Sequence, residues 1–164
     1  MKIVALSLSV LALTTGVAMA DLKAKVAAPW NGKKVPAGQN CALDGGNGST
    51  PPFQVTGIPD GTVWLIVEYN DKSYKPLSRN GGHGTIGYAV NGASGSFPAV
   101  PGMSARMPKG VQVIAAAKST GKYASPGYLP PCSGGRGNSY EAVVKAVDAN
   151  GKVLDKTRMS LGRY

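Results

Sequence analysis

The sequence predicts an all-β fold built mainly from antiparallel strands. The 164-residue chain contains 23 glycines and 12 prolines, which recur at short intervals and divide it into short segments. The segments between them are rich in Val, Ile, Thr and Tyr, the residues that suit a pleated, half-buried surface. No window of about 11–18 residues repeats its apolar positions with the period of a helix, so little helix is expected.

Five segments have the composition of strands. The clearest is a nearly continuous apolar run bounded by Asp60-Gly61 and Asn70-Asp71, and it is typical of a buried central strand. The third segment contains three consecutive alanines, which leave a short helix as an alternative there. The predicted strands span residues 62–69, 86–90, 110–117, 140–148 and 152–164. Long loops rich in glycine and proline are expected at 91–109 and 121–139.

The last two strands are predicted to form a β-hairpin. Asn150-Gly151, which lies between them, is the dipeptide that favours positive φ at both central residues of a type I′ turn. After the turn, charged and apolar residues alternate, and Glu141 and Lys145 interrupt the apolar run before it. One face of the hairpin should therefore be exposed to solvent.

The first twenty residues have the features of a secretory signal peptide. Lys2 gives a positive start, residues 3–13 are mostly apolar, and Ala18-Met19-Ala20 is a small-x-small cleavage site. We therefore expect an exported protein, periplasmic or secreted, whose residues 21–164 form a single domain. No later segment is apolar for about 18 residues, so no transmembrane segment is expected.

Export determines how the two cysteines are interpreted. In an oxidising compartment Cys41 and Cys132 are expected to form a disulfide. A zinc site needs more ligands than one histidine and two distant cysteines provide, and a redox site needs a Cys-x-x-Cys pair. Neither a metal nor another cofactor is predicted.

The charge of the chain favours anionic partners. The formal net charge is +10 at pH 7, which suits nucleic acid, lipid headgroups or acidic polymers. Export argues against nucleic acid. The basic residues are spread along the chain, with Lys33-Lys34 as the longest run, so a solvated cationic surface without a single partner is the alternative.

The only histidine, His83, lies within a Gly-x-Gly-x-x-Gly pattern that begins at Gly82. A dinucleotide-binding loop needs a helix after this pattern and an acidic residue about 20 positions further on. Here a predicted strand follows, and no Asp or Glu lies between positions 72 and 140. Nucleotide binding is not expected. No nucleophile–base pair is visible in the sequence, so an enzyme is not expected either.

Two loops, residues 41–52 and 123–140, each combine one cysteine with a Pro-Pro step. A disulfide would make these loops neighbours. Prolines stiffen such loops and glycines expose backbone N–H groups, a combination that can form a preorganised anion pocket. Two stapled loops without a ligand are the alternative interpretation.

Five blocks in this part of the chain occur in a recognisable order. They are Cys41 to Pro52 with Gly57-Ile58-Pro59-Asp60-Gly61-Thr62, the strand that ends at Asn70-Asp71, His83, residues 127–140, and Met159-Ser160-Leu161-Gly162-Arg163-Tyr164. Their order and spacing resemble the phosphatidylethanolamine-binding protein family, in its exported, disulfide-bearing bacterial branch, often labelled Raf kinase inhibitor-like. The resemblance covers roughly residues 35–164. It implies a β-sandwich with a large central sheet, a smaller packed sheet, and a pocket for phosphate-like groups.

The resemblance also implies candidate ligand-binding residues at the matching positions. These are Asp71, His83, Gly127, Pro130, Pro131, Asn138 and Tyr140. Either Asn70 or Asp71 matches the acidic position of the family. Gly82 and Gly84 stand where the family has tryptophans, and we expect these glycines to place the imidazole at the rim of the pocket.

Asn138 stands where the family has its second histidine. An asparagine can donate a hydrogen bond to an oxyanion but carries no charge, so the pocket should bind phosphate more weakly and with a simpler pH dependence. We expect a non-catalytic binding protein for a small anion or phospholipid headgroup near His83. The alternative is a protein-interaction or inhibitor domain whose cationic surface engages an acidic protein or envelope polymer, with the anion pocket degraded.

Overall fold

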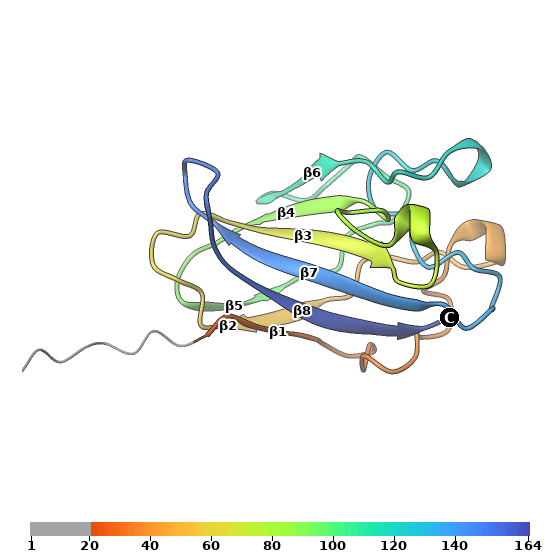
Figure 1. Cartoon of the computed structure of the whole chain (residues 1–164), viewed down its shortest axis with the longest axis horizontal. Coiled ribbons are helices and arrows are strands. Elements are labelled where there is room, and N and C mark those ends of the chain that lie inside the picture. Colours follow the sequence, from red (N-terminus) through yellow and green to blue (C-terminus); the bar gives the residue numbers. More distant parts are fainter. Residues whose placement is uncertain (1–20) are drawn as a thin grey trace, which may run out of the picture.

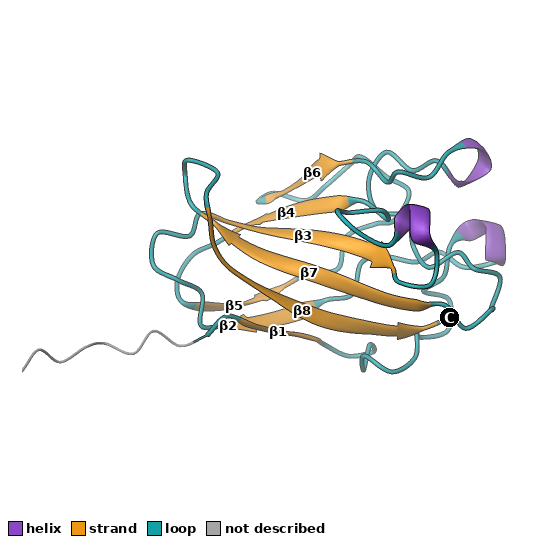
Figure 2. Cartoon of the chain, viewed as in Figure 1, coloured by secondary structure: helices purple, strands orange, loops and turns teal. Residues whose placement is uncertain are grey.

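The computed structural model describes residues 21–164, which form two antiparallel β-sheets around one apolar core (Figures 1 and 2). The only helical elements in this range are three short 3₁₀ turns, η1 (Ala42–Asp44), η2 (Lys75–Leu77) and η3 (Gly121–Tyr123). The predicted all-β class is therefore confirmed. The predicted signal peptide, residues 1–20, lies outside the described residues. None of the helical turns described is long and apolar enough to cross a membrane.

The large sheet contains the five strands that the sequence predicts, and β3 lies at its centre. In spatial order the strands are β6 (Val111–Ala115), β4 (Thr85–Ala89), β3 (Trp64–Asp71), β7 (Ser139–Val147) and β8 (Val153–Arg163). Residues 110–117 thus contain a strand and no helix. Because side chains alternate along a strand, Leu65, Val67 and Tyr69 of β3 point into the core.

The small sheet contains strands that the sequence pattern does not reveal. Its order is β1 (Lys23–Val26), β2 (Phe53–Thr56) and β5 (Ser94–Phe97), each four residues long. The predicted loop at 91–109 is therefore wrong in part, because β5 lies within it. Backbone pairing to β2 and the stacking of Phe97 on Phe53, with ring centroids 5.0 Å apart, hold β5 in place.

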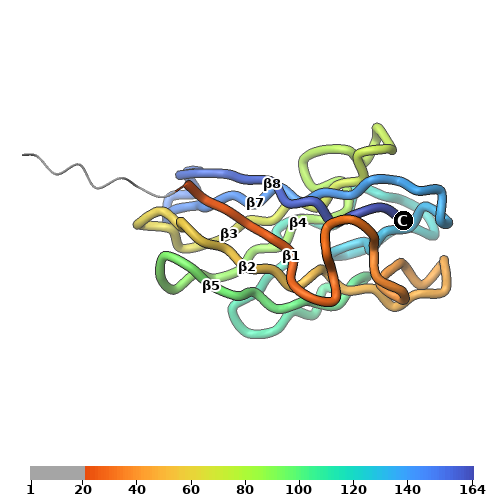
Figure 3. The backbone as a smooth tube through the Cα atoms, turned by 90° about the horizontal axis from the view of Figure 1, so that it is seen from below, coloured from red at the N-terminus to blue at the C-terminus, as the bar shows by residue number. Residues whose placement is uncertain are grey.

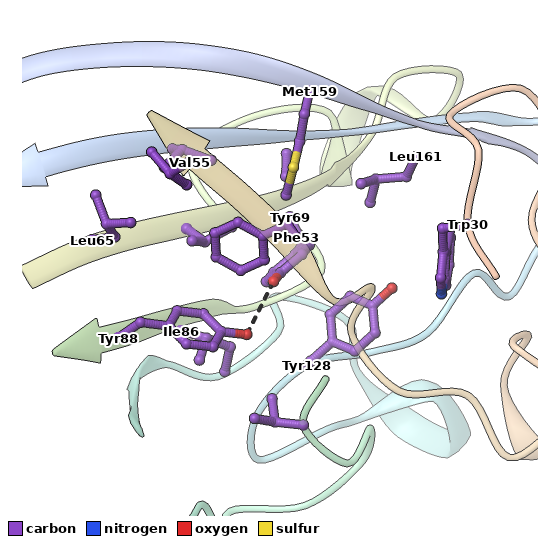
Figure 4. Packing of buried hydrophobic residues seen from close by; sticks show 14 of the residues in the cluster. Trp30, Phe53, Val55, Leu65, Tyr69, Ile86, Tyr88, Tyr128, Met159 and Leu161 are labelled. Carbon is purple, nitrogen blue, oxygen red and sulfur yellow. Dashed lines mark hydrogen bonds between the residues drawn. The ribbon is translucent and has the colours of Figure 1, made fainter. Parts of the chain in front are cut away.

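The core between the sheets contains several buried tyrosines (Figure 4). Tyr69, Tyr88 and Tyr128 are fully buried, and the Tyr69 and Tyr88 hydroxyls lie 3.4 Å apart. The Thr50 hydroxyl lies 3.3 Å from that of Tyr88. Burial raises the pKa of all three tyrosines, so they stay neutral and pack as amphipathic core residues.

The predicted hairpin of β7 and β8 is present, but its turn is of another type. Gly151 has positive φ whereas Asn150 does not. The Gly151 N–H donates to the Asp148 carbonyl, and the Asp148 N–H donates to the Lys152 carbonyl, which defines a three-residue loop. Asp148 Oδ1 accepts the N–H groups of Asn150 and Lys152 at 2.9 Å each. This local side-chain cap favours the longer loop over the two-residue type I′ turn.

The loops at the C-terminal end of β3 are joined covalently and by backbone pairing. Cys41 and Cys132 form the predicted disulfide, with Cα atoms 5.2 Å apart, and the Cys41 N–H donates to the Pro131 carbonyl. The segment that follows β1 runs beside the end of β8, where Lys34 and Arg163 form an isolated bridge (Figure 3). The loops at 41–52 and 123–140 are therefore neighbours, as expected.

Candidate functional site

A pocket of about 410 Å³ opens where β3 ends and β7 begins. Its walls come from η2, from the loop before β4, from the segment after β6 and from the loop before β7. The lining residues are Asp71, Tyr74, Pro76, Leu77, His83, Lys118, Ser119, Thr120, Tyr123, Leu129, Cys132, Ser133, Arg136 and Asn138. Three of the seven residues predicted for the site, Asp71, His83 and Asn138, are among them.

His83 lines the pocket from a buried position and is not at its rim. Its exposed fraction is only 4%, so the predicted rim position is wrong. Its Nδ1 lies 2.8 Å from the Leu129 carbonyl oxygen. A carbonyl oxygen can only accept, so Nδ1 carries the hydrogen and Nε2 is the nitrogen left for a ligand. Burial lowers the pKa of His83, although the Leu129 carbonyl and the Asp71 carboxylate oppose this shift.

The two glycines beside His83 explain why the imidazole is buried. A Cβ at Gly82 would lie 2.1 Å from the Leu77 carbonyl oxygen, and one at Gly84 would lie 2.5 Å from the Gly127 carbonyl oxygen. Gly84 also has φ of +104°, which disfavours other residues. The absence of side chains thus lets two neighbouring backbone segments close over the histidine loop, where tryptophans would not fit.

Asp71 and Asn138 form one hydrogen-bonded unit in the wall of the pocket. Asp71 Oδ1 accepts the backbone N–H groups of Ser73 and Tyr74, at 2.9 and 3.1 Å. Asp71 Oδ2 accepts from Asn138 Nδ2 at 2.7 Å. Both carboxylate oxygens are therefore occupied, and Asn138 keeps its side-chain oxygen and one N–H for a ligand.

Asn70, the other candidate for the acidic position, has a structural role. Its Oδ1 accepts the N–H groups of Gly81 and Gly82, at 3.1 and 3.2 Å, and its Nδ2 donates to the Glu68 carbonyl at 3.1 Å. It does not line the pocket. Its side chain is used to hold the turn that precedes His83, so Asp71 is the position that faces the pocket.

Tyr140 lies behind the pocket wall and is not among the lining residues. It pairs with Asp71 across β3 and β7, and its ring packs edge-on against the imidazole of His83, with centroids 5.4 Å apart. Its hydroxyl lies near Asp71, Ser133 and the Cys132 backbone, yet it makes no hydrogen bond of good geometry within residues 21–164. Burial raises the pKa of Tyr140, so the hydroxyl is a neutral donor without a partner.

Gly127, Pro130 and Pro131 lie outside the pocket lining. A Cβ at Gly127 would lie 2.3 Å from the Ser104 carbonyl oxygen. The ring of Pro130 packs so closely on Gly48 and Gly102 that a Cβ at either glycine would clash with it. The Pro131 carbonyl accepts the N–H of Cys41 at 2.9 Å. In this structure the three residues shape the loops behind the pocket.

Two cationic residues of the pocket were missed by sequence reasoning. Lys118 follows β6, and Arg136 lies in the glycine-rich loop before β7. Two hydrogen bonds position Lys118. Its Nζ donates to the Arg79 carbonyl oxygen at 3.4 Å, and its backbone N–H donates to the Gly82 carbonyl. Lys118 belongs to no motif, and Arg136 lies within the block at 127–140 without being one of its candidate residues, so only the general excess of basic residues pointed toward them. With Asp71 as the one lining carboxylate, the pocket is suited to an oxyanion.

One cluster of metal-ligand residue types lies beside the pocket, formed by Cys41, Asp44 and Cys132. The disulfide uses both sulfurs, and Asp44 Oδ2 accepts the N–H of Gly134 at 2.8 Å. The cluster therefore offers no thiolates and a carboxylate that is already partnered, which does not suit a metal ion.

The sequence matches no family model and no curated protein. Among solved structures the fold is similar to the crystal structure of CT736 of Chlamydia trachomatis, described as a homologue of the phosphatidylethanolamine-binding proteins. The two chains are 18% identical, the match covers 88% of this chain and 97% of the other, and the TM-score is 0.58. The chain therefore has the fold of the phosphatidylethanolamine-binding proteins, which confirms the fold that the five sequence blocks implied.

Proposed function

We propose that the protein is a divergent, exported member of the phosphatidylethanolamine-binding protein family. We further propose that its His83 pocket binds a small phosphate-bearing ligand, such as a phospholipid headgroup. The observation that carries this proposal is the composition of the pocket, where Lys118, Arg136 and Asn138 line the same cavity as a buried imidazole. The Cys41–Cys132 disulfide supports export, since disulfides persist in oxidising compartments.

The protonation state of the His83 ring determines which protonation state of a phosphate ligand it can bind. With Nδ1–H donated to Leu129, the neutral ring can only accept at Nε2. A phosphate that keeps one proton can donate it to Nε2. A dianion instead binds the doubly protonated ring, and its charge raises the pKa of His83. Lys118 and Arg136, both exposed, supply the charge that attracts either form.

The hydroxyl groups of the pocket support binding without catalysis. The Ser119 hydroxyl donates to the Tyr123 carbonyl at 2.7 Å, and the Ser133 hydroxyl donates to the Tyr164 carbonyl at 2.9 Å. No described hydroxyl is hydrogen-bonded to His83, whose Nδ1 is occupied by a backbone carbonyl. A nucleophile activated by this histidine is therefore not in place.

Thermal unfolding with a panel of ligands tests the proposal. Phosphate, phosphoethanolamine, phosphocholine and nucleotides are compared for the wild type, His83→Gln and Arg136→Gln, with Arg106→Gln as the charge-matched control outside the pocket. A ligand at 100 times its Kd adds about 2.7 kcal/mol to the free energy of unfolding, which raises the Tm measurably. Both pocket variants should lose this shift and the control should keep it. Absence of a shift with every ligand, or an equal loss in the control, contradicts the proposal.

A further inference from the structure

A second cavity, of about 540 Å³, lies on the outer face of the large sheet. The strands β3, β7 and β8 form its floor, and residues 78–80, between η2 and β4, form one wall. In Figure 1 this face is turned toward the viewer, with η2 standing over the end of β3. We call this cavity the sheet groove. Leu77 lines the His83 pocket whereas Ser78 lines the groove, so the same loop separates the two sites.

The sheet groove is strongly cationic. Two carboxylates, Glu68 and Glu141, face a larger set of cations: Lys72, Arg79, Lys145, Lys156 and Arg158. Glu68 Oε1 pairs with Lys145, and Glu141 Oε1 is shared by Lys72 at 3.3 Å and Arg158 at 3.8 Å. Within residues 21–164, Arg79 and Lys156 have no carboxylate partner. The cations therefore exceed the counter-charges that the protein supplies.

The pairing of β7 with β8 adds a second observation, because it brings two lysines together on the floor of the groove. Lys145 and Lys156 are directly opposite each other in the register of the two strands. Like charges at directly opposed positions destabilise a sheet. Glu68 neutralises Lys145, with Nζ to Oε1 at 2.6 Å, but nothing described neutralises Lys156. An anion that lies across β7 and β8 would pair with Lys156, whose charge is not offset by Glu68.

We propose that the sheet groove binds an acidic polysaccharide chain. Such a chain carries carboxylate or sulfate groups that are separated by hydroxyls. In the groove, the cations are likewise separated by carboxylates and by neutral side chains. Glu68 and Glu141 interrupt the cations along the floor, which suits spaced charges better than a continuous run of phosphates. At the wall, the Asn80 amide can bond to sugar hydroxyls, and the Ser78 hydroxyl, which donates to the Lys75 carbonyl at 2.9 Å, can accept from one.

The lining of the groove disfavours other anionic macromolecules. No lining residue is aromatic, whereas proteins that bind single-stranded nucleic acid stack the bases on aromatic side chains. Val143 is the only apolar residue of the lining, so the groove offers no apolar surface to insert into a bilayer. An acidic sugar chain needs neither feature, so the lining of the groove is compatible with it.

Titration with a heparin octasaccharide, an acidic sugar chain, tests this proposal. Binding is measured by calorimetry on the purified oxidised protein at low and at physiological salt. Lys156→Gln combined with Arg158→Gln should weaken binding about tenfold or more, since each removes a charge-assisted contact. The matched control is Lys23→Gln with Lys25→Gln, two exposed lysines with the same spacing on β1. Arg136→Gln, which removes an exposed cation of the other pocket, should leave octasaccharide binding unchanged, and inorganic phosphate should weaken it no more than chloride of the same ionic strength. These two results separate this site from the proposed function.

Several results would overturn the proposal. Equal weakening in the β1 control would show that the overall charge of the protein, and not the sheet groove, causes the binding. Equal or tighter binding of a single-stranded oligonucleotide, or of phosphatidylglycerol vesicles, would assign the groove to another partner. If the double variant does not fold, the NMR amide signals of the wild type, followed during titration with the octasaccharide, test the proposal instead. On titration the Val143 and Lys145 amides should shift while those around His83 do not, and the reverse pattern contradicts the proposal.

Discussion

The Nδ1 atom of His83 lies 2.8 Å from the carbonyl oxygen of Leu129, a residue 46 positions further along the chain. Backbone bonds surround this contact, because the Leu129 N–H donates to the His83 carbonyl and the His83 N–H donates to the Tyr69 carbonyl. The imidazole is thus fixed between β3 and the loop that carries the disulfide. Its tautomer and its position do not depend on a ligand.

The burial of His83 predicts a pH-dependent loss of stability. Unfolded, the imidazole gains a proton below its ordinary pKa of 6.5, whereas the folded pKa is lower. The unfolded state therefore binds more protons between these two values, and the free energy of unfolding decreases as pH falls through that window. Above pH 6.5 this group contributes no pH dependence. Urea denaturation at a series of pH values measures the effect.

The control for this prediction is His83→Gln. Glutamine offers an N–H to the Leu129 carbonyl but does not titrate, so the variant should lack the part of the decline that begins near pH 6.5. Saturating sulfate should raise the imidazole pKa in NMR titrations of the wild type, since an anion favours the charged ring. Identical pH profiles for wild type and variant would contradict the buried, neutral imidazole.

The parts of the fold that the sequence predicts are those with strong local patterns. The apolar run that becomes β3 and the alternating residues of β8 predict their strands because one or both faces are buried. The strand β5, Ser-Gly-Ser-Phe, carries no such pattern and exists because its backbone pairs with β2. The hairpin loop differs from the predicted type I′ turn because Asp148, which lies outside the Asn150-Gly151 dipeptide, caps a longer loop.

The residues of the candidate site also divide into those that the sequence predicts and those that it does not. Asp71, His83 and Asn138 line the pocket and were predicted, because they occupy positions in ordered blocks of sequence. Lys118 and Arg136 also line it. Lys118 lies outside these blocks, and Arg136 lies inside one of them but matches no family ligand position, so the contribution of each to the pocket depends on the path of its loop. Tyr140 was expected at a ligand and instead supports His83 from behind, since its side chain points to the core face of β7.

The hydrogen bond from Asn138 Nδ2 to Asp71 Oδ2, at 2.7 Å, predicts the effect of an isosteric change. Asn138→Asp removes the donor and puts a second carboxylate beside a buried one. The expected cost at pH 7 is about 1–3 kcal/mol of unfolding free energy. Acid should relieve much of this cost, because one proton shared by the pair removes the repulsion. Urea denaturation at pH 7 and pH 4.5 measures both effects.

Asn31→Asp is the matched control for this substitution. Asn31 Oδ1 accepts the N–H groups of Lys33 and Lys34, at 2.9 and 3.2 Å, and a carboxylate accepts equally well. This variant should keep the stability of the wild type at pH 7. If Asn138→Asp is no less stable than Asn31→Asp at neutral pH, the Asp71–Asn138 bond does not hold the pocket wall.

The packing of Gly82 predicts that a single methyl group disturbs the pocket. In Gly82→Ala the new Cβ would meet the backbone of Leu77, with the carbonyl oxygen at 2.1 Å. Backbone cannot move aside as a side chain can, so the expected cost is about 1–3 kcal/mol together with weaker anion binding. In the control Gly95→Ala, the nearest atoms belong to the Phe97 ring, at 3.2 Å, which can shift. Equal thermal stabilities for the two variants would contradict this reading of the histidine loop.

The disulfide links residues 91 positions apart, and its removal should affect stability and binding together. In the chain-entropy model, closing a loop of this length contributes about 4–5 kcal/mol through the unfolded state. Cys41→Ala with Cys132→Ala should therefore lower the free energy of unfolding by a large fraction of this amount.

Cys132 also anchors the segment that carries Ser133, Arg136 and Asn138 to the pocket. The variant should thus need more phosphate for the same rise in Tm, measured at a temperature where it is fully folded. Unchanged phosphate affinity in a destabilised variant would show that backbone bonds such as Cys41 N–H to the Pro131 carbonyl suffice to hold the pocket.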